Sequence, residues 1–204
     1  YFNTPNQEGL GKKIAALEKS EAGMIFSSGM AAVSHCLLAF LHKGDHVVLP
    51  QTLYGGTYNF VLEEFHKFGI AYTFADGFTE KDFAKAIKIN TKVIYAETPS
   101  NPLMKITDLE IIARLAKQHS LVSMIDNTFA SAINQTPADF GIDIMIHSAT
   151  KYMGGHSDIC AGAVAASSKH MDVIWNISKN IGGSLSDYTA VSDTHLTLPT
   201  NIQV

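Results

Sequence analysis

The stretch "KVIYAETPSNPLMKITDLEIIARLAKQHSLVSMID" (92–126) holds two short apolar runs on either side of an amphipathic segment. Both runs are β-rich and end at a polar residue, which is typical of buried strands. Between them, Thr107 and Glu110 have the spacing of a capping box. Apolar residues then repeat at helical spacing: Leu109, Ile112, Ala113 and Ala116. The stretch therefore predicts a strand–helix–strand unit with a helix over 107–119.

The same alternation recurs along the rest of the chain. Further short apolar runs lie at 46–50, 71–76, 142–149 and 162–167, with amphipathic stretches between them. Strands that are apolar on both faces and alternate with helices argue for a mainly parallel sheet covered by helices on both faces. We therefore expect one large α/β domain.

Composition narrows the classes of partner. The chain has 204 residues, of which 46% are hydrophobic and 17% are charged, as in a globular domain with a substantial core. Its net charge of −4 comes from 15 basic and 19 acidic residues. They form no basic stripe for a nucleic acid and no polybasic patch for a membrane surface. A small-molecule partner is the better expectation.

Cysteine usage and the termini bear on the compartment. Cys36 and Cys160 are the only cysteines, and they form neither a C-x-x-C pair nor a disulfide framework, which favours a reducing cytoplasm. No apolar run approaches the roughly 20 residues that span a bilayer, and no signal segment opens the sequence. Because the chain starts at Tyr1 rather than at a methionine, an upstream targeting segment stays an open alternative.

Reactive side chains follow three successive predicted strands. Glu97 ends one strand and Asp126 ends the next. A third strand is followed by Ser148, Thr150 and Lys151. Ligands of such sheets bind at the carboxyl ends of the strands. An aspartate in this place is, by itself, more often a turn residue or a helix cap. The coincidence of three strand ends, rather than any one residue, makes this set a candidate site.

Lys151 lies in "HSATKYMGGHSD" (147–158), beside an aromatic residue and two glycines rather than beside other charges. The glycines allow the backbone to approach a ligand closely. A lysine whose amine has lost its proton can attack a carbonyl and form a Schiff base. Judged on this segment alone, an ordinary surface lysine is the better-supported alternative.

The segment "SSGMAA" (27–32) precedes an apolar helical run. Small residues at a helix start leave backbone N–H groups and the positive end of the helix dipole available to a phosphate. A plain serine N-cap with a glycine in the turn is an equally good interpretation. Neither G-x-G-x-x-G after a strand nor G-x-x-x-x-G-K-[ST] occurs, so dinucleotide and P-loop sites lose support.

A metal centre is a weaker hypothesis. His147, His156, Asp158 and Cys160 lie close together in the sequence, but their spacing matches no H-E-x-x-H pattern. We therefore expect no metal ligands. A metal-assisted hydrolase is the competing hypothesis, and it predicts activity that a chelator abolishes.

Five segments, in this order and spacing, resemble the Cys/Met-metabolism family of pyridoxal-phosphate enzymes. The family includes cystathionine γ-synthase, cystathionine β-lyase, cystathionine γ-lyase and methionine γ-lyase. The segments are "SSGMAA" (27–32), "LYGGTY" (53–58), "AETPSNPL" (96–103), "IDNTFAS" (125–131) and "HSATKYMGGHSDICAG" (147–162). The resemblance covers residues 5 to about 190. It implies an aspartate-aminotransferase-type fold (fold type I), pyridoxal 5'-phosphate as cofactor, and a homotetramer built of dimers.

The resemblance also implies roles for individual residues. Lys151 forms the Schiff base with the cofactor and later acts as a base, and Asp126 holds the protonated pyridine nitrogen. Tyr54 stacks on the cofactor ring and takes part in proton transfer, and Asn101 approaches the phenolic oxygen. Glu97 lies in the same motif as Asn101. Five groups are expected to hold the phosphate: the hydroxyls of Ser148, Thr150 and Ser28, and the backbone amides of Gly29 and Met30.

By the same resemblance we expect a cytoplasmic transsulfuration enzyme with an amino-acid substrate. A cystathionine C–S lyase, acting by β- or γ-elimination, is the first hypothesis. Cystathionine γ-synthase and methionine γ-lyase are the alternatives. Gly56 stands where the methionine γ-lyases carry a cysteine, which lowers support for the last of these. A non-catalytic fragment that keeps part of the fold is the competitor from a different class.

Both ends of the chain depart from the family pattern. Residues 1–8 resemble the remnant of an N-terminal arm, and the Tyr-x-Arg of the family is not visible there. Residues 9–190 correspond to the cofactor-binding domain. Residues 191–204 lack the expected apolar helix, so we expect an out-of-family tail. We further expect that the C-terminal domain, with its substrate-carboxylate arginine, is missing and that the truncated chain is inactive by itself.

Overall fold

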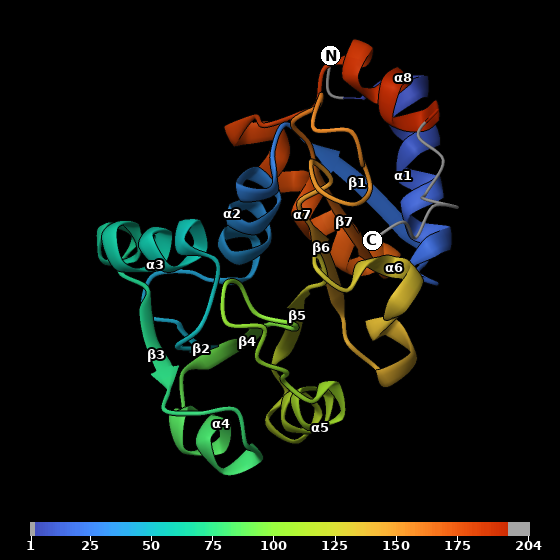
Figure 1. The fold of residues 1–204 in the computed structure, drawn as a ribbon. Helices are drawn as coiled ribbons and strands as arrows, with labels where there is room; N and C mark the ends of the chain where they lie inside the picture. The colour runs from blue at the N-terminus through green and yellow to red at the C-terminus, as the bar shows by residue number, and fades with distance from the viewer. Residues whose placement is uncertain (1–2, 196–204) are drawn as a thin grey trace.

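Seven strands form one sheet in the computed structural model, which describes residues 3–195. They are β1 (Ala22–Phe26), β2 (His46–Pro50), β3 (Ala71–Ala75), β4 (Thr91–Glu97), β5 (Val122–Asp126), β6 (Ile144–His147) and β7 (Gly162–Ala166). Their order in the sheet is β1–β7–β6–β5–β4–β2–β3 (Figure 1). Neighbours from β3 to β6 are parallel, and β7 is antiparallel to both β6 and β1. The expected mainly parallel sheet is confirmed, with β1 as a strand that the sequence patterns did not predict.

Helices cover both faces of the sheet (Figure 1). One face packs against α1 (Pro5–Leu17), α4 (Glu80–Ala86), α5 (Leu109–His119) and α8 (Asp187–His195). The other face packs against α2 (Gly29–Phe40), α3 (Gly55–Phe68) and α7 (Ser168–Ile181). Two short elements, α6 (Ser131–Asn134) and η1 (Pro137–Phe140), connect β5 to β6. The layering explains why the strands read as continuous apolar runs, since both of their faces are buried.

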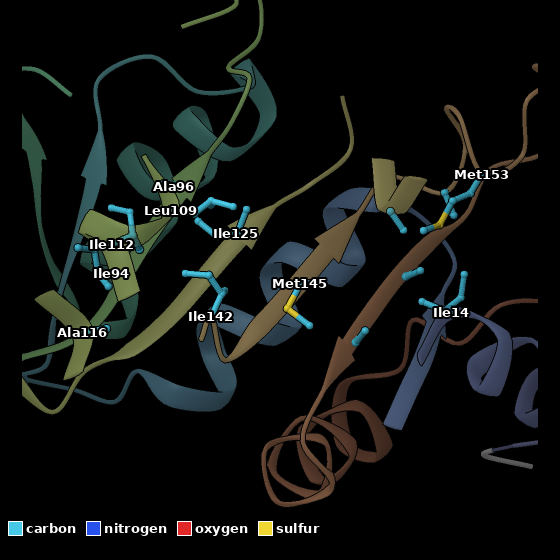
Figure 2. Close-up of a cluster of buried hydrophobic side chains, with 14 of the residues drawn as sticks. Ile14, Ile94, Ala96, Leu109, Ile112, Ala116, Ile125, Ile142, Met145 and Met153 are labelled. Atoms are coloured by element: carbon cyan, nitrogen blue, oxygen red, sulfur yellow. The ribbon is translucent and has the colours of Figure 1, made fainter. Parts of the chain in front are cut away.

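Alternate side chains of each central strand enter opposite cores. In β4, Ile94 and Ala96 pack on the α5 side, whereas Val93 and Tyr95 pack on the α2 side. Figure 2 shows the first of these cores, in which apolar side chains from β4, β5 and β6 lie along one face of the sheet against those of α5. All four β4 side chains are fully buried, which fixes the register of this strand and the position of its end.

The helix of the opening stretch is confirmed, but its predicted cap is wrong. α5 begins at Leu109, and its N-cap is Asp108, whose Oδ1 accepts the backbone N–H of Glu110 at 2.8 Å. Thr107 is buried instead, and its hydroxyl has no partner within residues 3–195. Aspartate is as good an N-cap as threonine, so the two could exchange roles without changing the helix by more than one turn.

Two further findings concern the ends of the chain and its surroundings. None of the helices in residues 3–195 is both long enough and apolar enough to cross a membrane. The predicted out-of-family tail begins inside α8, which ends at His195. Its residues 196–204 lie outside the described part of the chain, and its origin stays a prediction.

Candidate active site

The carboxyl ends of β4, β5 and β6 open into a cavity of about 360 Å³. Every residue that the sequence assigned to the site lines this cavity: Ser28, Gly29, Met30, Tyr54, Asn101, Asp126, Ser148, Thr150 and Lys151. Glu97 lines it too, together with Cys160 of the weaker metal hypothesis and three residues without a predicted role: Val33, Thr128 and Phe129. The structure therefore brings together side chains from segments that lie more than a hundred residues apart.

Strand register places the two carboxyl groups of the site beside each other. Glu97 is the register partner of Asp126 in the β4–β5 pair, and Asp126 is the partner of Ile146 in the β5–β6 pair. Beyond the strands, the Ser148 N–H donates to Thr128 Oγ1 at 2.8 Å. The parallel strands thus end together, and the chain leaves each of them at the same edge of the sheet.

Asp126 is only 7% exposed, and its carboxyl group is held at both oxygens. Oδ1 accepts the N–H of Thr128 at 3.0 Å and its hydroxyl at 2.6 Å, while the Tyr95 hydroxyl donates to Oδ2 at 3.4 Å. Burial raises the pKa of Asp126, and the Thr128 bonds oppose this by favouring the carboxylate. A cation placed against Asp126 would favour the carboxylate further, so the group is suited to a positively charged ligand atom.

Glu97 performs a different task, because its two oxygens tie down two loops. Oε2 accepts the N–H of Tyr54 at 2.7 Å, and Oε1 accepts the N–H of Asn101 at 2.8 Å. Burial, and then the negative charge of Asp126, raise the pKa of Glu97 to about 8. Glu97 therefore fixes the backbone of the two residues expected to contact the ring and the phenolic oxygen of a cofactor.

The start of α2 presents two backbone donors to the cavity. Ser28 is the N-cap, and its hydroxyl and carbonyl oxygens accept the N–H groups of Ala31 and Ala32, each at 3.1 Å. Within residues 3–195, the N–H groups of Gly29 and Met30 are left without an acceptor. A Cβ at Gly29 would lie 2.8 Å from Ser148 Cβ, so only glycine lets the helix start this close to the β6 end.

This arrangement is suited to an anion. Two unpaired amides at a helix N-terminus lie beside the Ser148 side chain, whose oxygen makes no hydrogen bond within the described residues. Amide donors and the helix dipole favour negative charge at such a place. The Ser28 hydroxyl accepts the Ala31 N–H as the helix cap, and its own hydrogen can still be donated to a phosphate.

Thr150 is bound to its own loop. Its hydroxyl donates to the Ala161 carbonyl at 3.1 Å and accepts the Ala161 N–H at 2.9 Å. An anion needs a donor, and this hydroxyl directs its hydrogen to Ala161. The phosphate role of Thr150 stays a prediction, and the geometry gives it a second role in closing the loop 148–161.

Lys151 and Tyr54 are the exposed members of the set. Lys151 lies in the turn after β6, where its N–H donates to the Ser148 carbonyl at 3.0 Å and its own carbonyl accepts the Gly155 N–H at 2.7 Å. The Tyr54 side chain is 47% exposed at the start of α3. Both line the same cavity as the buried Asp126. An amine, an aromatic ring and a buried carboxyl group therefore surround the same space.

The histidine-rich segment does not form a second centre. Of its four candidate ligands only Cys160 lines the cavity, whereas His156 and Asp158 do not and His147 is buried outside the lining. In the described part of the chain, no group of three or more His, Cys, Asp or Glu side chains is placed to hold a metal ion. A second cavity, of about 330 Å³, lies between α1, β1 and α7, away from these strand ends.

Sequence patterns missed two residues that touch Asp126. Thr128 follows Asp126 by two positions, the spacing of a local side-chain-to-backbone turn, so this contact had a signal. Tyr95 comes from the neighbouring strand, two residues before Glu97, and therefore lies on the same face of β4. Only the pairing of β4 with β5 reveals that its hydroxyl reaches Asp126.

Comparisons with known proteins identify the family of the chain. A family model described as "Cys/Met metabolism PLP-dependent enzyme" matches residues 2–195. Cystathionine beta-lyase MetC of Bacillus subtilis (strain 168) is 46% identical over 168 residues, which are 82% of this chain and 43% of that protein. Cystathionine gamma-lyase of the same organism is 44% identical over 182 residues, 89% of this chain and 48% of that protein.

A solved structure extends the likeness to three dimensions. The crystal structure of cystathionine gamma-lyase from Lactobacillus plantarum complexed with L-serine superimposes with a TM-score of 0.91 at 38% sequence identity. The match covers 95% of this chain and 51% of that one. The chain thus spans about half the length of the relatives that it matches.

Proposed function

Because the chain belongs to the Cys/Met metabolism PLP-dependent enzyme family, we propose that its full-length protein cleaves a carbon–sulfur bond of cystathionine. The observation that carries the proposal is the single cavity in which Lys151, Asp126 and the start of α2 meet. The two relatives named as cystathionine lyases support the same reaction class.

The donor set of the cavity fits pyridoxal 5'-phosphate. The amides of Gly29 and Met30, with the Ser148 hydroxyl, suit a phosphate. The buried carboxyl group of Asp126 suits a protonated ring nitrogen, and the Lys151 amine suits an aldehyde. The glycine at 29 leaves the space that a Cβ would fill. Each polar part of the cofactor therefore has a partner of complementary chemistry.

The bound cofactor would supply an aldehyde that takes up amino groups and a ring that accepts the electron pair of the substrate's α-carbon. Lys151 would hold the cofactor through its amine and, when its amine is free, would take the proton from the substrate's α-carbon. Asp126 would keep the proton on the ring nitrogen. Tyr54 would cover the ring from the start of α3, and Glu97 fixes the backbone of Tyr54 and Asn101.

Local packing at Gly56 favours a cystathionine lyase over a methionine γ-lyase. A Cβ at Gly56 would lie 2.5 Å from Tyr54 Cε1 and 3.0 Å from Met30 Sδ. A cysteine here, as the resemblance places in methionine γ-lyases, would have to displace the Tyr54 ring. The orientation of Tyr54 is thus matched to glycine at this position.

The family resemblance also implies an assembly of subunits, which we propose for the full-length protein. Three exposed apolar side chains support this proposal: Leu103 (61%), Met104 (57%) and Ile106 (66%), in the loop after Asn101. Apolar patches of this kind are typical of surfaces that another chain covers. Light scattering of the full-length protein should give the mass of a tetramer, and a monomer would contradict the proposal. A cytoplasmic location stays a prediction.

Product analysis of the full-length protein with cystathionine tests the function. Pyruvate with homocysteine would identify β-elimination, and 2-oxobutyrate with cysteine would identify γ-elimination. Either pair should be lost in Lys151→Ala and after removal of pyridoxal phosphate. If neither pair forms but cysteine and an activated homoserine ester give cystathionine, the reaction is γ-replacement and the lyase proposal is wrong. Activity that is independent of the cofactor and is abolished by a chelator would indicate a metal hydrolase.

A further inference from the structure

Glu18 is a buried carboxyl group at the end of α1, in an environment that is unfavourable for its charge. It is 0% exposed, and burying a carboxylate is unfavourable unless it is paired. It is the C-cap of α1, where the helix dipole disfavours negative charge. Its Oε2 has no hydrogen-bond partner within residues 3–195. Such a combination calls for a compensating role.

The other carboxyl oxygen of Glu18 joins two residues that border the site. Oε1 accepts Asn127 Nδ2 at 2.8 Å and is hydrogen-bonded to His147 Nε2. Asn127 directly follows Asp126, and His147 directly precedes Ser148. Glu18 therefore holds the chain at the carboxyl ends of β5 and β6, on the face of the sheet that α1 covers.

Gln135 extends this network to the third strand end. Its Nε2 donates to Asn127 Oδ1 at 2.8 Å and to the Thr98 carbonyl at 3.0 Å, and its own carbonyl accepts Asn127 Nδ2 at 2.9 Å. Thr98 follows Glu97 directly. One connected set of buried hydrogen bonds thus spans the ends of β4, β5 and β6, and networks of this kind fix a single arrangement.

Asp126 has its own set of hydrogen bonds beside this network. Thr128 Oγ1 accepts the Ser148 N–H and donates to Asp126 Oδ1, so Thr128 joins the end of β6 to the Asp126 carboxyl group. The two sets meet along the chain, because Asn127 precedes Thr128 and His147 precedes Ser148. The titratable groups around Asp126 in the described residues are Tyr95 and Glu97 from β4 and His147 from β6, with Tyr54, Lys151 and Cys160 in the cavity wall.

Charge distinguishes His147 from the other buried groups in this set. Tyr95 and Glu97 are neutral or negative, and burial, followed by the negative charge of Asp126, raises the pKa of each of them. Positive charge on His147 lowers the pKa of Asp126, against the effect of burial. Glu18 is the acidic group that contacts the His147 ring.

We propose that Glu18 is a positioning residue that acts through His147 to keep Asp126 ionised and directed at the cofactor's ring nitrogen. This role rests on the proposed function, because it needs the cofactor in the cavity. The order of effects is electrostatic: the Glu18 anion stabilises the His147 cation, the cation stabilises the Asp126 anion, and that anion holds the proton of the ring. Glu18 itself touches neither substrate nor cofactor.

The direct test follows the proton on the ring nitrogen. Full-length protein is loaded with pyridoxal phosphate carrying ¹⁵N in the ring, and the ¹⁵N chemical shift is recorded against pH. Glu18→Gln keeps the shape of the side chain and removes its charge. We expect its ring nitrogen to lose the proton about one pH unit below the wild type, a tenfold weaker proton affinity. Glu8→Gln, at an exposed position of the same helix, is the matched control and should titrate as the wild type does.

A second variant guards against loss of folding. His147→Gln removes the cation by another route, and it should give a shift in the same direction. The double variant should shift no further than one single variant, because both changes break the same chain of charges. Circular dichroism checks that each variant is folded before the titration is read.

The outcomes separate this role from a structural one and from the proposed function. A variant that melts earlier or binds the cofactor more weakly, yet titrates like the wild type, would show that Glu18 only holds the fold together. If both Glu18→Gln and His147→Gln titrate like the wild type, the proposal is wrong while the proposed function stands. If the wild-type protein does not bind the labelled cofactor, the proposed role of Glu18 and the proposed function are both wrong.

Discussion

Asp126 and Glu97 lie side by side at two strand ends, yet their hydrogen bonds give them different tasks. Asp126 accepts from Thr128 and Tyr95 and faces the cavity, whereas Glu97 accepts two backbone N–H groups and orders loops. Two carboxyl groups this close repel each other once both are ionised. The pKa of each is raised, with burial as the largest cause.

Glu97→Gln should change how stability depends on pH. The pKa of Glu97 is raised from 4.5 to about 8, so the folded protein binds this proton more tightly than the unfolded chain. Its contribution to the free energy of unfolding is therefore full below about 4.5 and is lost as the pH rises through about 8. Urea unfolding across this range should show a steeper fall for the wild type than for the variant. Glu63→Gln, at an exposed position of α3, is the control, and equal slopes for all three proteins would contradict the assignment.

Among single residues, sequence patterns predicted the site residues that follow strands and missed the residues that hold those site residues in place. Lys151, Asp126 and Ser148 could be placed because strand ends converge in any parallel sheet. Glu18 could not, because it carries no strand-end signal and reaches His147 across 129 positions. A buried ion pair between distant segments has no local pattern, so only the fold reveals it.

Among the elements, α1 and β1 pack unusually closely because both carry glycine at the contact. A Cβ at Gly11 would lie 2.4 Å from the Gly23 carbonyl oxygen, and one at Gly23 would lie 2.2 Å from the Gly11 carbonyl oxygen. This close approach brings the end of α1, and with it Glu18, to the sheet. It also explains why β1 was hard to predict, since glycine is disfavoured in strands and interrupts the apolar pattern.

Gly11→Ala and Gly9→Ala form a matched pair in α1. The first places a methyl group against the backbone of β1 and should destabilise the protein by about 1–3 kcal/mol. The second meets nothing within 4 Å, so it should stabilise by about 0.5–1 kcal/mol through helix propensity alone. Urea unfolding of the two variants measures both effects. Equal effects of the same sign would show that the α1–β1 contact is not as close as the structure has it.

Element boundaries were the least predictable part of the fold. The helix over 107–119 was confirmed as α5, yet Asp108 rather than Thr107 caps it. Both residues are good caps, and the choice depends on Thr107 being drawn into the interior, where its N–H donates to Thr98 Oγ1 at 3.1 Å. Tertiary contacts of this kind decide between caps that local sequence leaves equal.

Over the whole molecule, the sheet order determines where the site forms. β4, β5 and β6 are adjacent and parallel, so the three reactive segments leave the sheet at one edge, while α2 brings its N-terminus to the same place. The two cores on either side fix the register of these strands. The alternating pattern of the sequence predicted this architecture, but it did not predict that β7 turns antiparallel to reach β1.

Cofactor binding should stabilise the whole protein, and the start of α2 should control the size of the effect. At 100 times its dissociation constant, pyridoxal phosphate should add about 2.7 kcal/mol to the free energy of unfolding. Gly29→Ala should reduce this gain, because its Cβ would lie 2.8 Å from Ser148 Cβ and force α2 away from the β6 end.

Gly55→Ala is the control for that substitution, since its Cβ would meet nothing within 4 Å. Thermal unfolding of the full-length proteins with and without the cofactor measures the gain in each case. An equal gain in stability on cofactor binding in the wild type and in Gly29→Ala would show that the start of α2 is not part of the phosphate site.

The most direct test of the central claim locates the residue that carries the cofactor. Full-length protein loaded with pyridoxal phosphate is reduced with borohydride, digested, and mapped by mass spectrometry. We predict one equivalent of the reduced cofactor on Lys151, none in Lys151→Ala, and full labelling in Lys117→Ala, which changes an exposed lysine of α5. A label on another lysine, with Lys151 unmodified, would contradict the account.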